Sequence, residues 1–175
     1  MLNIIVVEDE PLFATTLKQL IELNPCYVVT DIADDCAGAL GAVARRRPDL
    51  ALVDLQLARG STGFALAAKL GELGIPCLFT SGKAPGFAMP DLAIGCLAKP
   101  FSEDDLVRAL KTAEDLLRGR ERHRPSRPGN LWLYASDDGR AAEGPRSPSP
   151  DHAEPPPARP RRLRFWPPGL RGRAG

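Results

Sequence analysis

The stretch LNIIVVEDEP, residues 2–11, decides the fold of this chain. Five of its first six residues are apolar, as in a strand that is buried on both faces of a sheet. Three carboxylates, Glu8, Asp9 and Glu10, follow at once and precede a proline. Like charges side by side repel one another, and folding alone gains nothing from clustering them. The stretch therefore predicts a buried strand whose tip holds a positively charged partner.

Residues 1–118 alternate β-rich runs with amphipathic helical patterns. The β-rich runs predict strands at residues 2–7, 26–33, 49–55, 75–82 and 92–100. The spacing of apolar residues predicts helices at residues 11–23, 37–47, 64–73 and 103–118. Only a short or irregular helix is expected at residues 83–91, because two prolines interrupt that stretch.

Strands that are apolar along their length and alternate with helices are typical of a parallel sheet covered on both faces. The predicted fold class is α/β: a doubly wound, flavodoxin-like sheet of five parallel strands in the order 2-1-3-4-5. Ligands bind such sheets beyond the carboxyl ends of the strands, where the order reverses between the first and third strands. We therefore expect the functional residues at that edge.

Residues 119–175 have a different composition. They hold 11 prolines, and their 12 arginines and 6 acidic residues give them a charge of +6. Residues 1–118 have 11 basic and 16 acidic residues and carry a charge of −5, so the whole chain has its net charge of +1. This predicts a domain at 1–118 followed by a disordered Pro/Arg-rich low-complexity tail. Two apolar islands interrupt the tail. NLWLYA (130–135) is expected to form a short strand or an anchor on the domain, and LRFW (163–166) could contact an acidic partner, nucleic acid or a membrane surface.

Several classes of protein are not expected. The first apolar run is short and lacks preceding basic residues, unlike a signal peptide, and no apolar run is long enough to span a membrane. The four cysteines are scattered, without the spacing of thiol metal sites or redox motifs, and are expected to be free thiols. A cytoplasmic location is the resulting expectation.

Polar residues stand at the carboxyl ends of the predicted strands. Asp54 ends the third strand, Thr80 lies near the end of the fourth, and Lys99 ends the fifth. Together with Glu8 and Asp9 they would meet at one edge of the sheet. A hard, oxygen-seeking cation such as Mg²⁺ would offset the repulsion between the carboxylates there.

Four segments in this order resemble the receiver domain of two-component response regulators: VVEDEP, LVDL, FTSG and LAKPF. The resemblance covers residues 2–118. It implies that Glu8 and Asp9 hold Mg²⁺ together with Asp54, and that the backbone carbonyl of Gln56 completes the protein ligands.

The resemblance also implies that Asp54 is the phosphoacceptor, which receives the phosphoryl group of a sensor histidine kinase or a phosphotransfer protein. Lys99 would pair first with Asp54 and then with a phosphoryl oxygen, and Thr80 would supply a hydroxyl to the phosphoryl group. The bond between Lys99 and Pro100 matches a peptide bond that is cis in this family, so the resemblance implies that it is cis here.

The sequence departs from the family pattern at Cys96, where receivers usually carry Tyr or Phe three residues before the lysine. The usual coupling between the threonine and that ring is therefore not expected. LFTSGKAPGF and the loop DLQLARGSTG partly resemble stand-alone receivers of alphaproteobacterial stress signalling, although Phe79-Thr80 lacks the alanine between them.

The function expected is a phosphorylation-dependent signalling receiver, not an enzyme, with no attached DNA-binding or enzymatic output domain. The alternative is a pseudo-receiver that binds partners without being phosphorylated. An aspartyl-phosphate phosphohydrolase would need a second Asp where Gln56 stands, and a Rossmann domain would need GxGxxG after the first strand. Nucleic acid is not an expected partner, because aromatic residues are sparse among the tail arginines.

Overall fold

Parallel strands form the centre of the molecule and follow the predicted order. The computed structural model describes residues 1–57, 62–83, 85–120 and 128–134. The elements are β1 (Leu2–Val7), α1 (Pro11–Glu22), β2 (Tyr27–Ala33), α2 (Cys36–Arg45), β3 (Leu50–Asp54), α3 (Gly63–Glu72), β4 (Cys77–Ser81), β5 (Gly95–Ala98), α4 (Glu103–Leu117) and β6 (Leu131–Leu133).

The sheet has the order β2-β1-β3-β4-β5-β6. The first five strands are parallel and confirm the predicted order 2-1-3-4-5. The sixth strand, β6, was not among the five and pairs antiparallel with β5. It lies within the apolar island 130–135, beyond the predicted domain end at residue 118. Most of the predicted disordered tail, residues 121–127 and 135–175, lies outside the described residues.

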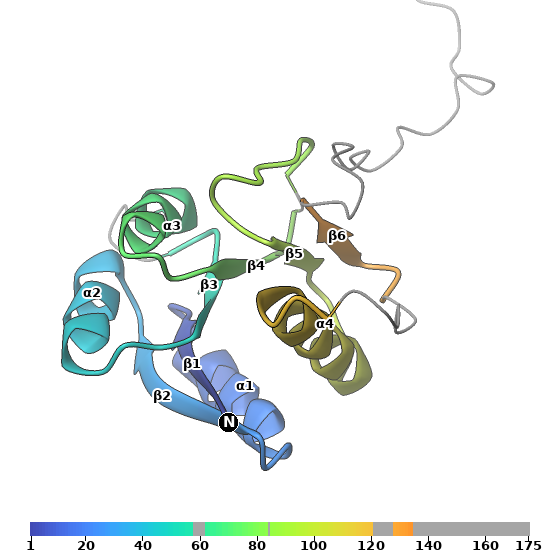
Figure 1. Cartoon of the computed structure of the whole chain (residues 1–175), viewed down its shortest axis with the longest axis horizontal. Helices are drawn as coiled ribbons and strands as arrows, with labels where there is room; N and C mark the ends of the chain where they lie inside the picture. Colours follow the sequence, from blue (N-terminus) through green and yellow to red (C-terminus); the bar gives the residue numbers. More distant parts are fainter. Residues whose placement is uncertain (58–61, 84, 121–127, 135–175) are drawn as a thin grey trace, which may run out of the picture. The chain divides into compact units, whose positions relative to one another are not determined.

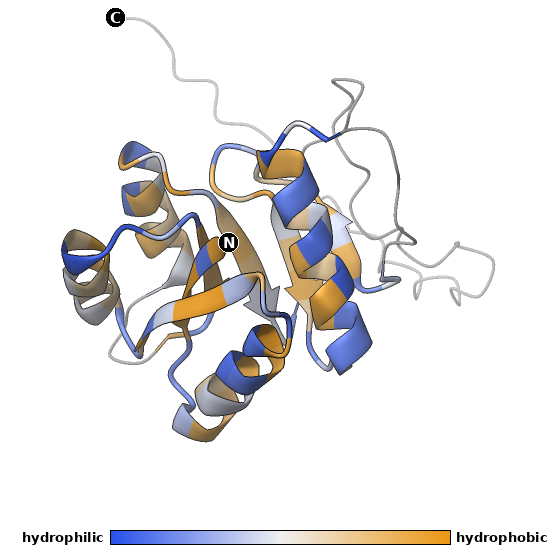
Figure 2. Cartoon of the chain, turned by 60° about the horizontal axis from the view of Figure 1, so that its bottom comes forward, coloured by the Kyte–Doolittle hydropathy of each residue, from blue (hydrophilic) through white to orange (hydrophobic). Residues whose placement is uncertain are grey.

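Helices cover both faces of the sheet (Figure 1). Successive residues of a strand point to opposite faces. Ile4 and Val6 of β1 accordingly belong to one hydrophobic cluster with α1 and α4, whereas Ile5 and Val7 belong to a second cluster with α2 and α3. Because β1 is buried on both sides, it reads as a nearly continuous apolar run. The hydropathy colouring shows the same arrangement, with blue outer faces on helices that turn orange faces inward (Figure 2).

Two helices begin at residues whose side chains cap them, Asp35 and Ser102. The Asp35 side chain accepts a hydrogen bond of 2.7 Å from the backbone N–H of Gly38 at the start of α2. At α4, Ser102 accepts from the backbone N–H of Asp105, and the Asp105 carboxylate accepts in return from the backbone N–H of Ser102. This capping box fixes the start of the helix that follows Lys99.

No α-helix occurs among residues 82, 83 and 85–94, the described part of the connection between β4 and β5. Pro85 and Pro90 lack the backbone N–H that a helix interior requires, so the irregular connection follows from the sequence. In the part of the chain that is described, no helix is both long and apolar enough to cross a membrane.

Candidate functional site

Three carboxylates converge at the carboxyl ends of β1 and β3. Val7 pairs with Val53 in the sheet, so the residues that follow, Glu8 and Asp54, lie side by side. Glu8, Asp9 and Asp54 each offer an oxygen, and these oxygens all lie within 4.8 Å of one another. Glu8 and Asp54 are buried, whereas Asp9 is exposed. The structure thus brings together the acids that the sequence placed at this edge.

Lys99 joins two of these carboxylates. Its ammonium nitrogen Nζ donates to Glu8 Oε2 at 2.8 Å and to Asp54 Oδ2 at 2.7 Å. Burial alone would lower the pKa of Lys99, but the hydrogen bonds to Asp54 and Glu8 outweigh it and raise that pKa. Burial raises the pKa of Glu8, although the hydrogen bond from Lys99 opposes the shift. We conclude that Lys99 stays charged and partly neutralises a buried acidic pair.

The backbone around Lys99 is set by β5 and by the following proline. The Lys99 backbone N–H donates to the carbonyl oxygen of Ser81 on β4 at 2.7 Å. The peptide bond from Lys99 to Pro100 is cis, as the resemblance implies. Lys99 therefore lies just beyond the carboxyl end of β5, at the same edge of the sheet as Asp54.

Sequence reasoning missed the aromatic neighbour of Lys99. The Lys99 ammonium lies over the ring of Phe13 on α1, 4.4 Å from the ring centroid, and a cation is attracted to such a ring face. The ring of Phe101 packs against Phe13 with 5.9 Å between the centroids. The position of Phe13, four residues after Asp9 and thus one helical turn beyond the acids, is the signal that could have indicated it.

Thr80 lies on β4 in register between Asp54 on β3 and Leu97 on β5. Its side chain is buried, with 1% of the residue exposed. The strand order alone therefore places Thr80 next to the carboxylate that the sequence assigns as phosphoacceptor. Its role toward a phosphoryl group stays a prediction.

Gln56 and Gly63 hold the end of β3. The backbone N–H of Gln56 donates to Asp54 Oδ1 at 3.0 Å, which leaves Oδ2 to Lys99. The use of the Gln56 carbonyl as a metal ligand stays a prediction. Gly63 begins α3 so close to β3 that an added Cβ would lie 2.3 Å from the Asp54 carbonyl oxygen. Sequence reasoning did not identify this close approach.

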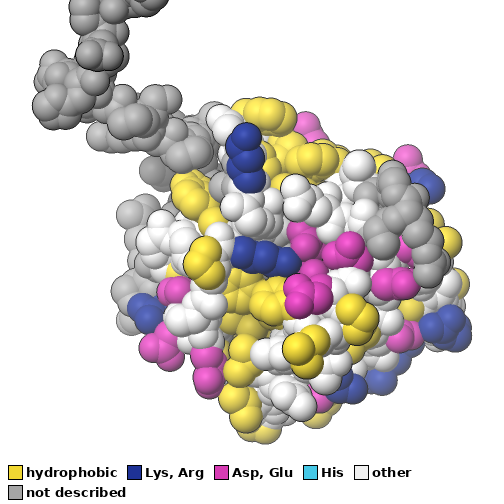
Figure 3. All heavy atoms as spheres, turned by 180° about the vertical axis from the view of Figure 1, so that it is seen from behind, with side chains coloured by type: hydrophobic (Ala, Val, Ile, Leu, Met, Phe, Trp, Pro, Cys, Tyr) yellow, Lys and Arg dark blue, Asp and Glu magenta, His cyan; other side chains and the backbone are white. Residues whose placement is uncertain are grey.

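The donor chemistry of the cluster fits Mg²⁺. Carboxylate oxygens are the ligands that this hard cation prefers, and the exposed position of Asp9 leaves one side of the cluster open to solvent. Figure 3 shows acidic side chains gathered beside a basic one on one face of the molecule. Glu8, Asp9 and Asp54 are the residues that would hold the ion.

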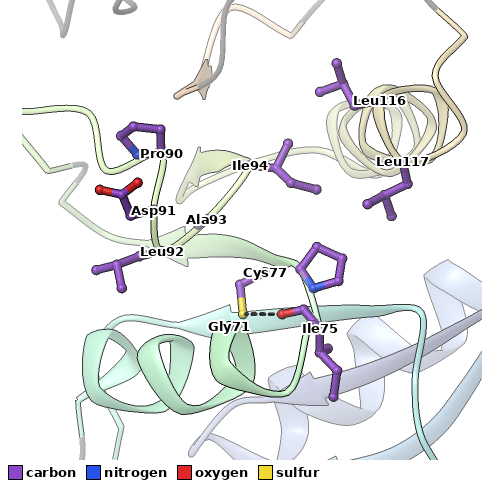
Figure 4. A pocket seen from close by; sticks show the side chains of 12 residues that line it. Gly71, Ile75, Cys77, Pro90, Asp91, Leu92, Ala93, Ile94, Leu116 and Leu117 are labelled. Carbon is purple, nitrogen blue, oxygen red and sulfur yellow. Dashed lines mark hydrogen bonds between the residues drawn. The ribbon is translucent and has the colours of Figure 1, made fainter.

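A separate pocket of about 510 Å³ contains none of these residues. It lies at the opposite ends of β4 and β5, and its wall is mostly apolar (Figure 4). Ile94, Leu116 and Leu117 contribute to that wall, and the buried Cys77 thiol contacts the Ile75 carbonyl oxygen at 3.8 Å. The pocket is therefore distinct from the acidic cluster.

A comparison with protein families agrees with the fold and the acidic cluster. The family model of the response regulator receiver domain matches residues 4–111. This chain belongs to the response regulator receiver domain family, whose general function is phosphorylation-dependent signalling in two-component systems.

Individual relatives are also response regulators. The positive alginate biosynthesis regulatory protein of Pseudomonas aeruginosa is 31% identical over 154 residues, covering 83% of this chain and 56% of that protein. The phyllosphere-induced regulator PhyR of Methylorubrum extorquens is 31% identical over 128 residues, which cover 69% of this chain and 48% of that protein. The chain spans about half the length of the curated relatives it matches. Because the two identities are equal, the sub-assignment to stress-signalling receivers stays a prediction.

Among solved structures, the signal receiver domain of a modulated diguanylate cyclase from Desulfovibrio desulfuricans G20 is similar, with a TM-score of 0.58 and 28% identity. The match covers 69% of this chain and 99% of that domain. The predicted receiver fold is thereby confirmed.

Proposed function

We propose that Asp54 is the phosphoacceptor of this receiver and takes its phosphoryl group from a sensor histidine kinase or a phosphotransfer protein. The observation that carries the proposal is the ion pair between Lys99 and Asp54 at 2.7 Å, beside two further carboxylates. A cation that is fixed against two carboxylates of an acidic cluster suits a site where negative charge develops on phosphoryl oxygens.

The reaction is a transfer between two residues. An Asp54 carboxylate oxygen attacks the phosphorus of a phosphohistidine whose imidazole ring carries a proton on its other nitrogen. The P–N bond breaks, and the imidazole leaves with the bonding electron pair while it keeps that proton. The products are a neutral histidine side chain and an acyl phosphate on Asp54. The Gln56 N–H holds Asp54 Oδ1, and Lys99 provides positive charge for the phosphoryl oxygens.

Mg²⁺ would be held by Glu8, Asp9 and Asp54, with the Gln56 carbonyl as the further protein ligand. When bound, the ion would neutralise charge on the transferred phosphoryl group. Binding of the ion at this place is supported by the closeness of the three carboxylates, of which Glu8 and Asp54 are buried and Asp9 is exposed.

The action of this chain without an attached output domain stays a prediction, because the curated relatives are longer than this chain. The downstream partner, the cytoplasmic location and the absence of nucleic-acid binding likewise stay predictions.

Incubation with Mg²⁺ and acetyl phosphate, followed by intact mass spectrometry, tests the proposal. The expected result is a gain of one phosphoryl group, as Asp54 attacks phosphorus and acetate leaves. The gain should be lost in Asp54→Asn and in a chelated sample. Asp91→Asn, an exposed acid at the separate pocket, is the matched control and should still be phosphorylated. No gain in the folded protein with either acetyl phosphate or a kinase would favour the pseudo-receiver.

A further inference from the structure

β6 covers the outer edge of β5. Gly95, Cys96 and Leu97 pair with Leu133, Trp132 and Leu131, in that order, in an antiparallel ladder. The Tyr134 backbone N–H extends the ladder by donating to the Ile94 carbonyl oxygen at 2.8 Å. Gly95 makes this approach possible, because an added Cβ would lie 2.3 Å from the Trp132 carbonyl oxygen.

The side chains of β6 and of Tyr134, the residue that follows it, enter both hydrophobic clusters. Leu131 and Leu133 pack on the side of α1 and α4. Tyr134 packs on the other side, where its ring centroid lies 6.5 Å from that of Phe79, the residue before Thr80. Cys96 belongs to the same cluster as Tyr134 and is fully buried. An extended segment that presents apolar side chains to both faces of the sheet is thus what the β5 edge accommodates.

Asn130 connects β6 to the phosphorylation site. Its backbone carbonyl oxygen accepts from the Ala98 N–H at 2.9 Å, and its side-chain amide Nδ2 donates to the Ala98 carbonyl oxygen at 3.2 Å. Ala98 immediately precedes Lys99. A displacement of the backbone at Lys99 would therefore act directly on both hydrogen bonds to Asn130.

The docked strand leaves polar groups unsatisfied. Among the described residues, the buried side-chain atoms without a hydrogen-bond partner are Asn130 Oδ1 and Tyr134 Oη, one at each end of β6. Burial raises the pKa of the Tyr134 hydroxyl, and the neighbouring Cys96 thiol adds to that rise. Sulfur is only a weak hydrogen-bonding group. Both polar atoms would gain water on release of β6, which offsets part of the lost apolar contact.

We propose that the β5 edge is a docking surface for an extended segment of a partner protein that is apolar on both faces, and that β6 occupies this edge until Asp54 is phosphorylated. This inference rests on the proposed function. A phosphoryl group on Asp54 moves negative charge from the carboxylate to oxygens farther from β3. Lys99 follows that charge, Ala98 shifts with it, and the hydrogen bonds to Asn130 weaken.

The thiol of Cys96 reports on this release. The full chain with Cys26→Ser and Cys36→Ser keeps two thiols, both buried, at Cys77 and Cys96. Burial raises the pKa of each to about 12, so both should react slowly with a thiol reagent. Phosphorylation by acetyl phosphate should accelerate labelling of Cys96 about tenfold or more, a tenfold shift in the strand-release equilibrium. Peptide mapping should show Cys77 still protected.

A variant and a peptide complete the experiment. Gly95→Ala, which excludes β6 from the edge, should label rapidly at Cys96 without phosphorylation. A fluorescent peptide of sequence PGNLWLYA, residues 128–135, should bind the phosphorylated chain more tightly than the unphosphorylated one.

Each outcome bears on the inference. Phosphorylation by intact mass with unchanged Cys96 labelling overturns the inference and leaves the proposed function standing. Equal acceleration at Cys77 and Cys96 indicates general unfolding and also overturns it. Faster Cys96 labelling without peptide binding overturns the docking surface. Absence of phosphorylation overturns both the inference and the proposed function.

Discussion

Lys99 determines how much negative charge the site can hold. Its ammonium bridges Glu8 and Asp54, which are only 3% and 6% exposed. Two buried carboxylates without a partner would repel each other and lack solvation. The lysine thus stabilises the folded state as well as the chemistry, and removal of its charge should show in both.

Substitution of Lys99 by Met should lower the free energy of unfolding in the presence of a chelator by about 1–3 kcal/mol, because two buried acceptors lose their donor. Mg²⁺ should restore part of the loss by supplying positive charge. Urea unfolding with chelator and with Mg²⁺ measures both effects. Lys69→Met, at an exposed lysine on α3, is the control. Equal losses in the two variants, or no effect of Mg²⁺, would contradict the prediction.

At the residue scale, the sequence predicted the charged site residues because their positions follow from strand order. Glu8, Asp9, Asp54 and Lys99 each stand at the carboxyl end of a strand, and parallel strands bring those ends together. Phe13 was missed because its role depends on how α1 packs on the sheet. No sequence pattern fixes that packing distance.

At the scale of elements, α3 sits against β3 at its first residue. The Cβ that an alanine would add at Gly63 meets backbone atoms, the Asp54 carbonyl oxygen at 2.3 Å and the Leu55 Cα at 2.8 Å. Backbone cannot rotate away as a flexible side chain can. The position of Asp54, the proposed phosphoacceptor, therefore depends on a residue without a side chain.

Gly63→Ala should lower the free energy of unfolding by about 1–3 kcal/mol through overpacking. It should also slow phosphorylation by acetyl phosphate, since Asp54 must move. Gly71→Ala on the same helix is the matched control, because the added Cβ would lie 4.0 Å from the Asp91 carbonyl oxygen, an ordinary van der Waals distance. That control should stabilise the protein by at most about 0.5–1 kcal/mol, because Gly71 lies in the last turn of α3 and alanine is favoured over glycine in a helix. If urea unfolding showed that both substitutions change the free energy of unfolding in the same direction, the explanation by overpacking at Gly63 would be refuted.

The sequence predicted the five parallel strands because each has a continuous apolar run between turn residues. For β6 the sequence left a strand and an anchor as alternatives, since Leu131–Leu133 is three residues long and lies in a Pro/Arg-rich stretch. Periodicity cannot distinguish a strand from an anchor over so few residues. Its pairing with β5 depends on the space above Gly95, which only the assembled sheet reveals.

At the scale of the whole molecule, a bound metal ion stabilises the fold by mass action. Mg²⁺ at about a hundred times its dissociation constant should add about 2.7 kcal/mol, if it binds only the folded state. Thermal unfolding should show a higher Tm with Mg²⁺ than with chelator. Asp9→Asn should remove most of the shift, and Glu10→Gln, at the adjacent exposed acid, should keep it. A shift that survives Asp9→Asn would argue against the assigned ligands.

Two buried thiols should make the whole fold sensitive to alkali. Burial raises the pKa of Cys77 and of Cys96 from 9.0 to about 12. Above pH 9 the unfolded chain loses these protons while the folded chain retains them, so stability is full below pH 9 and falls toward pH 12. Urea unfolding at neutral pH and at about pH 10 measures this fall. Cys77→Ala should make it shallower; an unchanged fall would disprove the assignment to Cys77.

The position of β6 also has a consequence for shortened forms of the protein. Proteolysis after residue 118 would spare all five parallel strands but remove Leu131–Leu133. The edge of β5 would then present unpaired backbone N–H and C=O groups beside newly uncovered leucine side chains. Such edges pair with edges of other molecules and lead to aggregation. The short edge strand β6 would in that case be what keeps separate copies of the receiver from adhering to one another.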